Sequence, residues 1–370
     1  MRYYTEIETI EQARDLIKDS NKIRLCAFQS IDFSQVLSEW YFVDFTDCLF
    51  IGCKLPSFML SRLDNSNAIL SAMNVPYQTF RSSLYNAASL YDAYNPDDES
   101  SIDLCYDSKV YKHFLATGKR ANDINETLAR TLHDHSMSDA MHDFLANYRE
   151  EDIVAVMGGH ALLRSDKHYR DVVYIAKALT ERGKIIVSGG GPGAMEAAHV
   201  GAWMAGRNIS EVEQALATLQ VSKSFDSPMW LKSAFEVMSR YPQKEYVSLG
   251  IPTWLYGHEP ATPFATHIAK YFDNALREDH LLTIAKGGVI YSPGSAGTMQ
   301  EIFQDAAQNH YISFGYASPM AFLGTNYWTQ ELPAYSLLQN MVETGRYKNL
   351  LLSLTDNIDD IINTIMAFKP

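Results

Sequence analysis

The chain has 370 residues, 46% of them hydrophobic and 12% aromatic, which suffices for a large core or two domains and excludes wholesale disorder. Because its formal net charge is −13, we expect neither nucleic acid nor an anionic membrane as a partner. The sequence has no run of about 18 uncharged apolar residues and no signal-peptide core near Met1. Its four cysteines form no Cys-x-x-Cys pair, so we expect reduced thiols in a cytoplasmic protein.

Residues 1–105 have an irregular pattern, and we interpret them as an N-terminal accessory region of mixed structure. Thr9 and Gln12 have the spacing of a capping box for a short amphipathic helix, residues 9–18. Apolar residues then recur every five positions in two phases, one with Phe45, Phe50 and Leu55, the other with Val43, Cys48 and Cys53. This rhythm resembles pentapeptide repeats, but ordinary short strands remain the alternative, because Phe28 and Phe33 fall in a different phase.

Residues 94–103 are rich in Asn, Asp and Ser and are predicted to be a linker, and residues 106–150 a helical connection. This connection contains His133, Asp134, His135 and His142. Because alternate positions of a helix do not share a face, we interpret these residues as a solvated helix face and predict no metal site.

Residues 151–370 alternate apolar runs with helical patterns, which predicts an α/β domain with a doubly wound, Rossmann-like parallel sheet. The expected strands are 153–157, 184–188, 246–250, 253–257, 287–292, 319–323 and 349–353. The expected helices are 166–182, 194–205, 263–284, 298–309, 332–345 and 356–367.

Glycine-rich turns follow three of the expected strands. The turn after the first strand contains Gly158, Gly159 and His160, and the turn after the second contains Gly189, Gly190, Gly191 and Gly193, followed by Met195. These glycines do not have the G-x-G-x-x-G spacing of a dinucleotide fingerprint, so a nicotinamide-dependent oxidoreductase is a weak alternative.

The third turn, after the strand ending at Tyr291, is the most informative stretch. It consists of Gly294, Ser295, Ala296, Gly297 and Thr298. A small-residue turn at the start of a helix presents unpaired amides and the positive end of the helix dipole, which is a ready site for an anion such as a phosphate. Glu301 follows one turn into this helix, where it would face a bound phosphate or serve as an acid that favours the helix dipole.

Two of these turns together resemble the LOG family, Rossmann-fold nucleotide-binding proteins also described as lysine decarboxylase-like. The resemblance rests on the Gly189–Met195 and Pro293–Glu301 turns, and it is strongest to the larger bacterial nucleotide nucleosidases of the PpnN type. It covers about residues 150–368 and implies a homodimer or a larger even-numbered homo-oligomer that needs no cofactor.

The resemblance also implies a reaction, the hydrolysis of the N-glycosidic bond of nucleoside 5′-monophosphates to a free base and ribose 5-phosphate. It implies a catalytic pair of Glu301 and Arg277, although Arg277 lies one residue farther from the motif than is usual in the family. Arg277 would either hold the phosphate or fix Glu301 through a bidentate pair. Ser295 replaces the second glycine of the family motif. The alternative function is a non-catalytic nucleotide-binding sensor that uses the same turns.

Overall fold

The protein, described here by a computed structural model of residues 3–35, 37–257 and 259–370, forms two compact units. One unit contains Met1–Leu84 and His113–Asp143, and the other contains Tyr85–Lys112 and Phe144–Pro370. These limits differ from the boundaries expected at residues 105 and 150. The difference arises because residues 85–112 join the larger unit, where the backbones of Tyr85 and Ile268 exchange hydrogen bonds of 2.9 and 2.8 Å. No helix among these residues has both the length and the apolar character that a membrane crossing requires.

The larger unit is built on a seven-stranded parallel sheet with the strand order β10-β9-β8-β7-β11-β12-β13. The strands are β7 (Ile153–Met157), β8 (Ile185–Ser188), β9 (Ser248–Gly250), β10 (His267–Ile268), β11 (Val289–Tyr291), β12 (Pro319–Leu323) and β13 (Leu351–Thr355). The central strands are buried along their whole length, as expected when helices cover both faces of a sheet. The predicted α/β fold with a parallel sheet is therefore confirmed.

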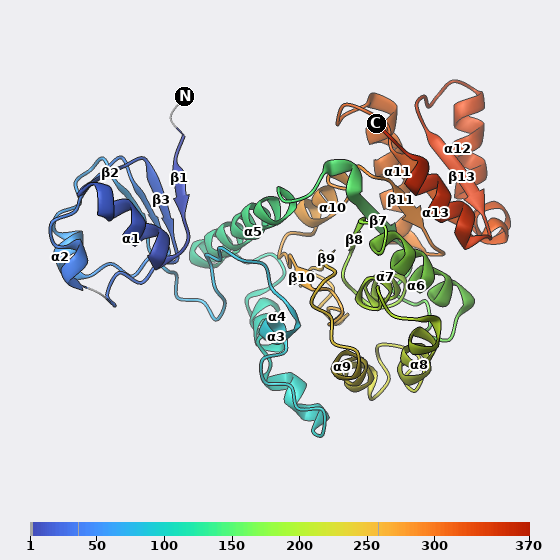
Figure 1. Ribbon diagram of the computed structural model, residues 1–370, viewed down its shortest axis with the longest axis horizontal. Coiled ribbons are helices and arrows are strands. Elements are labelled where there is room, and N and C mark those ends of the chain that lie inside the picture. The colour runs from blue at the N-terminus through green and yellow to red at the C-terminus, as the bar shows by residue number, and fades with distance from the viewer. Residues whose placement is uncertain (1–2, 36, 258) are drawn as a thin grey trace. The chain divides into compact units, whose positions relative to one another are not determined.

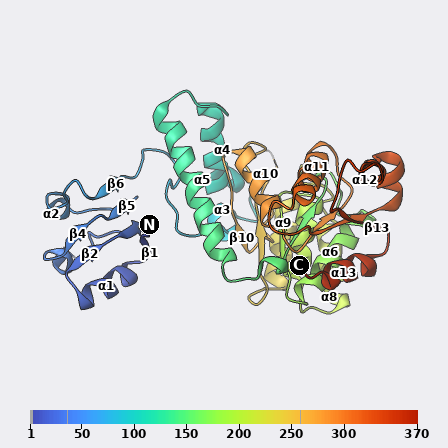
Figure 2. The ribbon, with the colours of Figure 1, turned by 90° about the horizontal axis from the view of Figure 1, so that it is seen from above.

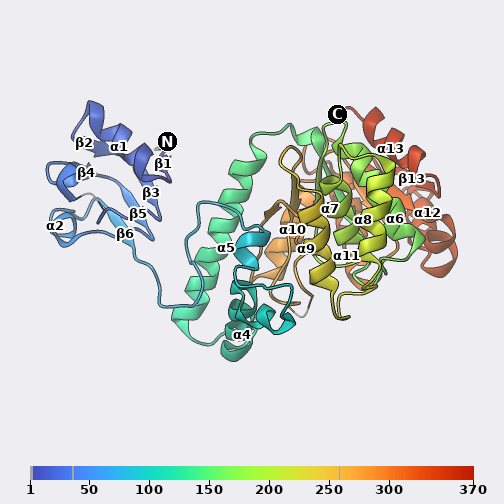
Figure 3. The ribbon, with the colours of Figure 1, turned by 60° about the horizontal axis from the view of Figure 1, so that its bottom comes forward.

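Helices cover both faces of this sheet. On one face α6 (Lys167–Thr180), α7 (Ala194–Trp203) and α13 (Ile358–Ala367) pack together (Figure 1). On the other face α10 (Asn274–Thr283) packs beside α11 (Ala296–Tyr311) (Figure 2). Two further helices, α8 (Ile209–Leu219) and α9 (Trp230–Arg240), lie beside α7 (Figure 3), and α12 (Ala334–Glu343) precedes β13.

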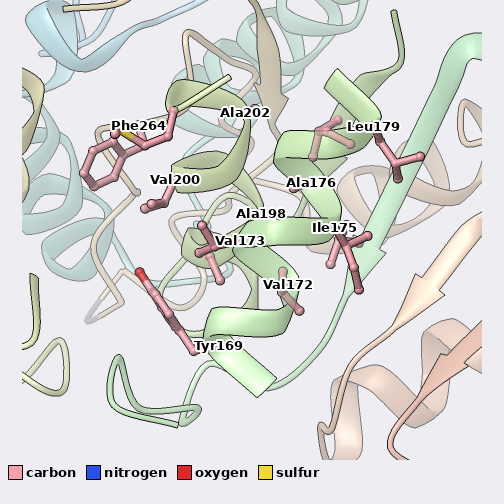
Figure 4. Packing of buried hydrophobic residues seen from close by; sticks show 14 of the residues in the cluster. Tyr169, Val172, Val173, Ile175, Ala176, Leu179, Ala198, Val200, Ala202 and Phe264 are labelled. Atoms are coloured by element: carbon pink, nitrogen blue, oxygen red, sulfur yellow. The ribbon is translucent and has the colours of Figure 1, made fainter. Parts of the chain in front are cut away.

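The core of the larger unit lies between β7, β8 and the helices α6 and α7. The apolar residues of α6 recur at helical spacing and are buried against small residues of α7 (Figure 4). They are Tyr169, Val172, Val173, Ile175, Ala176 and Leu179. The small side chains Ala197, Ala198 and Ala202 let the two helices approach closely, which fixes the position of the glycine turn that precedes α7.

Parts of the sequence prediction are wrong in the larger unit. Residues 253–257 form a turn instead of a strand, and residues 263–273, predicted to be helical, contain β10 and irregular chain before Asp273 caps α10. The predicted linker 94–103 overlaps a 3-10 helix, Glu99–Leu104, which Asp98 caps. Helices α8 and α9 were not predicted, although Asn208 and Glu211 form a capping box at the start of α8.

The smaller unit contains short parallel strands that stack in successive turns. One sheet has the order β1 (Thr5–Ile7), β3 (Cys26–Gln29), β5 (Leu49–Ile51) and β6 (Ala68–Leu70), and the other pairs β2 (Lys22–Arg24) with β4 (Asp44–Thr46). Helix α1 (Ile10–Asp19) begins with the predicted capping box of Thr9 and Gln12.

The five-residue rhythm of this unit corresponds to residues that point into its core. The rings of Phe28, Phe33, Phe45 and Phe50 are buried and pack against one another. Paired positions of successive turns, Phe28 with Phe50 and Ile23 with Phe45, are 22 residues apart, which is why Phe28 and Phe33 lie in a different phase. Assignment of the unit to pentapeptide repeats stays a prediction.

The predicted solvated face of the helical connection is wrong for two residues. The connection consists of α4 (Tyr106–Thr117) and α5 (Ile124–Leu145), and His133 and Asp134 of α5 are 0% and 3% exposed. His133 Nδ1 lies 3.0 Å from Asp134 Oδ1, so the two polar groups satisfy each other inside the unit. Only His135 of this sequence triplet is exposed.

A buried ion pair anchors α7 to the loop between β7 and α6, and the same arginine bonds α9. Both side chains are almost completely buried, and the Arg164 guanidinium bonds Glu196 Oε2 at 3.0 Å and Ser233 Oγ at 2.9 Å. Tyr169 Oη donates to the same carboxylate at 2.9 Å. Burial opposes the charge on Arg164, but Glu196 outweighs it and raises the pKa of the guanidinium.

We predict that Glu196→Gln lowers the free energy of unfolding of the larger unit by about 3–5 kcal/mol, because it leaves the buried guanidinium of Arg164 without its counter-charge. Differential scanning calorimetry checks this. Glu213→Gln, at a half-exposed ion pair with Arg170, is the control and should cost less than about 1 kcal/mol. Equal effects of the two variants would contradict the prediction.

Candidate functional site

The strand order has a topological switch point between β7 and β11. The chain runs from β7 outward through β8, β9 and β10 and then returns to β11 on the opposite side of β7. At such a switch point the loops after the two central strands diverge toward opposite faces, and ligands of open α/β sheets bind there, outside the carboxyl ends of the strands. The turns after β7 and β11 are two of the three glycine-rich turns found in the sequence.

The backbones of all three turns are in direct contact. Gly159 N donates to Pro293 O at 3.0 Å, and Ala194 N donates to Gly159 O at 3.1 Å. A Cβ on Gly193, whose φ is +68°, would lie 2.3 Å from Gly159 O, and a Cβ on Gly294 would lie 2.7 Å from Gly159 N. Glycine is therefore required at these positions for close approach, and the fold brings the three predicted turns together.

The third turn leads directly into α11, which has 16 residues. The first-turn amides of Ala296, Gly297 and Thr298 have no intrahelical acceptor and lie at the positive end of the helix dipole. Residues 295–297 are exposed, whereas Thr298 is buried. Tyr327 Oη donates a hydrogen bond to Gly294 O at 2.7 Å, which also holds the third turn in place.

The position of Ser295, where the family has a glycine, does not require a positive φ. Ser295 is the N-cap residue of α11 with φ −113°, a value that any residue can adopt. Its side chain makes no capping hydrogen bond and is exposed. The hydroxyl therefore stands beside the first-turn amides as an additional polar group.

Glu301 lies on α11, half-buried, and has no hydrogen bond or ion pair with any residue of the described chain. Burial raises the pKa of its carboxyl to about 7, while the charge of Arg277 lowers it and that of Glu278 raises it. A desolvated carboxyl that titrates near neutral pH one turn from a helix N-terminus is the kind of group that can serve as an acid or a base.

Arg277, on α10, is buried and holds two loops together. Its Nε donates to Ile251 O at 2.8 Å and its Nη2 to Gly189 O at 3.4 Å. Within the described residues it forms no ion pair with Glu301, so the bidentate pair considered from the sequence is not formed in this structure. Arg277 instead joins the loops after β8 and β9 and influences Glu301 through its charge.

The turn after β8 packs tightly on Arg277 and α7. A Cβ on Gly189 would meet Arg277 Nη2 at 2.4 Å and Met195 Sδ at 2.6 Å. A Cβ on Gly191 would meet Met195 Cε at 2.9 Å. Met195 therefore serves as the apolar support of this turn.

A buried Ser-His-Ser chain, for which no local sequence pattern was a signal, sets the conformation of the same turn. His199 lies between Ser188 Oγ, at 2.8 Å, and Ser248 Oγ, at 2.9 Å. Gly190 N donates to Ser188 Oγ at 3.0 Å, and Gly190 has φ +69°. Burial lowers the pKa of His199 to about 3, so its imidazole is neutral. Its two ring nitrogens hold Ser188 and Ser248 in place through hydrogen bonds.

His160, from the first turn, is exposed and belongs to a different group of side chains. Its Nδ1 lies 3.5 Å from Glu259 Oε1, and its ring contacts Phe225 edge to face. A Cβ on Gly191 would lie 3.7 Å from Glu259 Oε2, so this group borders the turn after β8. His160 does not cap a helix, because Asp166 is the N-cap residue of α6.

Two buried hydroxyls beside the glycine turns lack partners among the described residues. Ser292 Oγ, at the end of β11, and Thr262 Oγ1 are both on residues that are 0% exposed. Thr262 N donates to Gly190 O at 2.8 Å, and a Cβ on Gly158 would lie 3.1 Å from Ser292 Cβ. Both oxygens are closed off from solvent, so these hydroxyls border the turns without facing open space.

Three acidic residues of the smaller unit lie close enough together to share a ligand. In the part of the chain that the structure describes, one group of three carboxylates, Glu6, Asp139 and Asp143, brings ligand oxygens within 4.8 Å of one another, and it belongs to the smaller unit. Asp139 already accepts a hydrogen bond from Gln29 Nε2. They carry no metal assignment.

Comparisons with known proteins do not identify a family or a function for this site. Neither a search of protein families nor a search of curated proteins finds a match for the sequence. Among solved structures, the molybdenum cofactor binding protein from the phototrophic bacterium Rippkaea orientalis is 16% identical and matches with a TM-score of 0.36. The match covers 58% of this chain and 95% of that chain, and at this TM-score it supports no conclusion about function.

We predict opposite effects of alanine at two glycines of the third turn. Gly294→Ala should destabilise the larger unit by about 1–3 kcal/mol, since the added Cβ would lie 2.3 Å from Thr298 Oγ1. Gly297→Ala should stabilise it by about 0.5–1 kcal/mol, because no heavy atom lies within 4 Å and alanine favours a helix. Calorimetric unfolding of the two variants checks this, and a stable Gly294→Ala variant would contradict the described packing.

Proposed function

We propose that the protein hydrolyses the N-glycosidic bond of nucleoside 5′-monophosphates, releasing the base and ribose 5-phosphate, as the resemblance to the LOG family implies. The observation that carries this proposal is the convergence of three glycine turns at the switch point of the sheet, with Glu301 one turn inside α11. An oligomer with an even number of subunits belongs to the same proposal and rests on the same resemblance.

The start of α11 is the proposed 5′-phosphate site. The amides of Ala296, Gly297 and Thr298 provide hydrogen-bond donors, and the exposed Ser295 hydroxyl adds another. The chain carries a net charge of −13, so its overall field repels a phosphate. Directed local donors of this kind are therefore what a nucleotide would need in order to bind.

Glu301 is the proposed catalytic residue. Breaking the ribosyl C–N bond builds positive charge on the anomeric carbon, and a carboxylate stabilises that charge or orients the attacking water. The absence of a hydrogen bond from Glu301 to any described residue leaves its oxygens available to substrate. Burial makes the carboxylate stronger electrostatically, because a low dielectric screens its charge less than water does.

We propose that Arg277 acts on the reaction indirectly, by holding loops in place and by its charge on Glu301. Its hydrogen bonds to Ile251 O and Gly189 O hold the loops after β9 and β8 in place, and its charge keeps part of Glu301 ionised near neutral pH. In this arrangement Arg277 tunes and positions the site.

The test is incubation of the full-length protein with AMP, GMP, CMP, UMP and IMP, followed by chromatography of free base and ribose 5-phosphate. We expect release with at least one nucleotide and a loss of about a hundredfold to a thousandfold in kcat for Glu301→Gln. Glu278→Gln, on the adjacent α10, is the matched control and should keep the maximal rate. No release by protein at substrate-level concentrations, with nucleotide still bound, would favour a sensor over an enzyme.

The pH dependence of activity and of stability should run in opposite directions. Activity should rise with pH through about 7, since the ionised Glu301 is required. The pKa values of Glu301 and Asp305 are both raised by burial to about 7 from 4.5 and 3.8, so the folded state binds more protons than the unfolded state between these values.

The free energy of unfolding should therefore fall as pH rises from about 4 to 7, by about 1–3 kcal/mol for each of the two groups. Glu301→Gln removes one ionisation and should reduce this fall, as urea unfolding at pH 5 and pH 8 would show. An identical pH dependence in the variant would contradict the assigned pKa.

A further inference from the structure

The carbonyl group of Gly294, in the third turn, is held by a side chain from another loop. Tyr327 Oη donates to Gly294 O at 2.7 Å, and no backbone amide of the described residues donates to this oxygen. Glycine has no side chain that would restrict rotation of the peptide after it. The orientation of the peptide between Gly294 and Ser295 is therefore set by the hydrogen bond from Tyr327.

This hydrogen bond also fixes the direction of the next backbone amide. The peptide between Gly294 and Ser295 is planar and trans, so its N–H points opposite to its C=O. Because the C=O points to Tyr327, the N–H of Ser295 points away from it. Within the part of the chain that the structure describes, this N–H donates to no acceptor. The Ser295 amide is thus a further donor beside the first-turn amides of α11.

A side-chain hydroxyl on the same turn independently indicates a ligand. Thr298 is 4% exposed, and its Oγ1 lies so close to Gly294 that a Cβ there would be 2.3 Å away. This hydroxyl has no hydrogen-bond partner among the described residues, and unlike Ser292 Oγ it is not closed off from solvent. Because the hydroxyls of buried residues are usually hydrogen-bonded, an acceptor beside Gly294, such as a phosphate oxygen, would complete this group.

Tyr327 itself has a well-fixed position after β12. It begins a π-helical turn, Tyr327–Glu331, in which Leu332 N donates to Tyr327 O at 2.8 Å. The adjacent Trp328 is 0% exposed, donates from Nε1 to Leu323 O at 3.0 Å and packs edge to face on the Tyr327 ring. Single π-helical turns are rare and occur frequently at functional sites. The Tyr327 hydroxyl is therefore anchored independently of the turn that it contacts.

We propose that Tyr327 is a positioning residue of the 5′-phosphate site. Its hydrogen bond keeps the carbonyl of Gly294 turned away from the phosphate, so that the Ser295 N–H joins the first-turn amides of α11 and the Thr298 hydroxyl as donors. Without this bond the peptide can rotate, and the carbonyl oxygen then repels the anion that the amide attracts. This role rests on the proposed function, because it concerns the phosphate site of the same reaction.

Ribose 5-phosphate is a suitable probe, because it carries the phosphate, is not consumed and lacks a base. Tyr327→Phe keeps the ring and removes the hydroxyl. We expect isothermal titration of the full-length protein to show binding of ribose 5-phosphate that is about three- to tenfold weaker in this variant. For the nucleotide that is hydrolysed best, KM should rise by a similar factor while kcat stays within about twofold, as expected when ground state and transition state lose the same contact. A hydroxyl that only stabilises the fold would not separate KM from kcat in this way.

Tyr335→Phe is the matched control. Tyr335 is likewise half-buried, lies on α12, and its hydroxyl forms no hydrogen bond with a described residue, so this variant should leave the affinity and KM unchanged. Equal affinities of the two variants for ribose 5-phosphate, no binding of it by the unmodified protein, or an effect of Tyr327→Phe confined to kcat would overturn the proposal. A protein that releases no base, yet binds ribose 5-phosphate more weakly as Tyr327→Phe, would contradict the proposed reaction and support this role of Tyr327.

Discussion

The close approach of three backbone turns at the carboxyl edge of the sheet is the constraint on which the larger unit depends. Gly159 is in contact with the turn before α7 and with the turn before α11, and a side chain on Gly193 or Gly294 would collide with it. Two helices are thereby fixed with their N-termini at one point. The open amides of α11 and the position of Glu301 follow from this contact, because the third turn and the helix it starts cannot shift without breaking it.

Helix α7 joins this constraint to the rest of the unit. Its first turn carries Met195, which supports the Gly189–Gly191 turn, and Glu196, which anchors Arg164. One turn later His199 links Ser188 of β8 to Ser248 of β9. Helix α11 carries two carboxyls, Glu301 and Asp305, whose pKa values burial raises to about 7. Asp305 is satisfied by Tyr291 and Asn309, whereas Glu301 forms no hydrogen bond with a described residue.

Local sequence patterns predicted those parts of the site that are formed by residues close together in the sequence. The apolar runs of β7, β8, β11 and β12 and the glycine turns after them were found because each lies within a few residues. The Ser188–His199–Ser248 chain and the role of Arg277 depend on strand order, which places residues far apart in sequence next to one another. Residues 253–257 and 263–273 were predicted wrongly because contacts such as Trp254 N with Tyr271 O override their local propensity.

The central claim is that the switch point holds a nucleoside 5′-monophosphate by its phosphate. Equilibrium binding to Glu301→Gln, which retains the turns but should not consume substrate, tests it most directly. Isothermal titration with AMP and with adenosine, and likewise for the other four bases, separates the contribution of the phosphate. The account predicts that at least one monophosphate binds ten or more times more tightly than its nucleoside, and that Gly294→Ala abolishes this preference. Equal affinity for nucleotide and nucleoside, or a preference unchanged by Gly294→Ala, would contradict it.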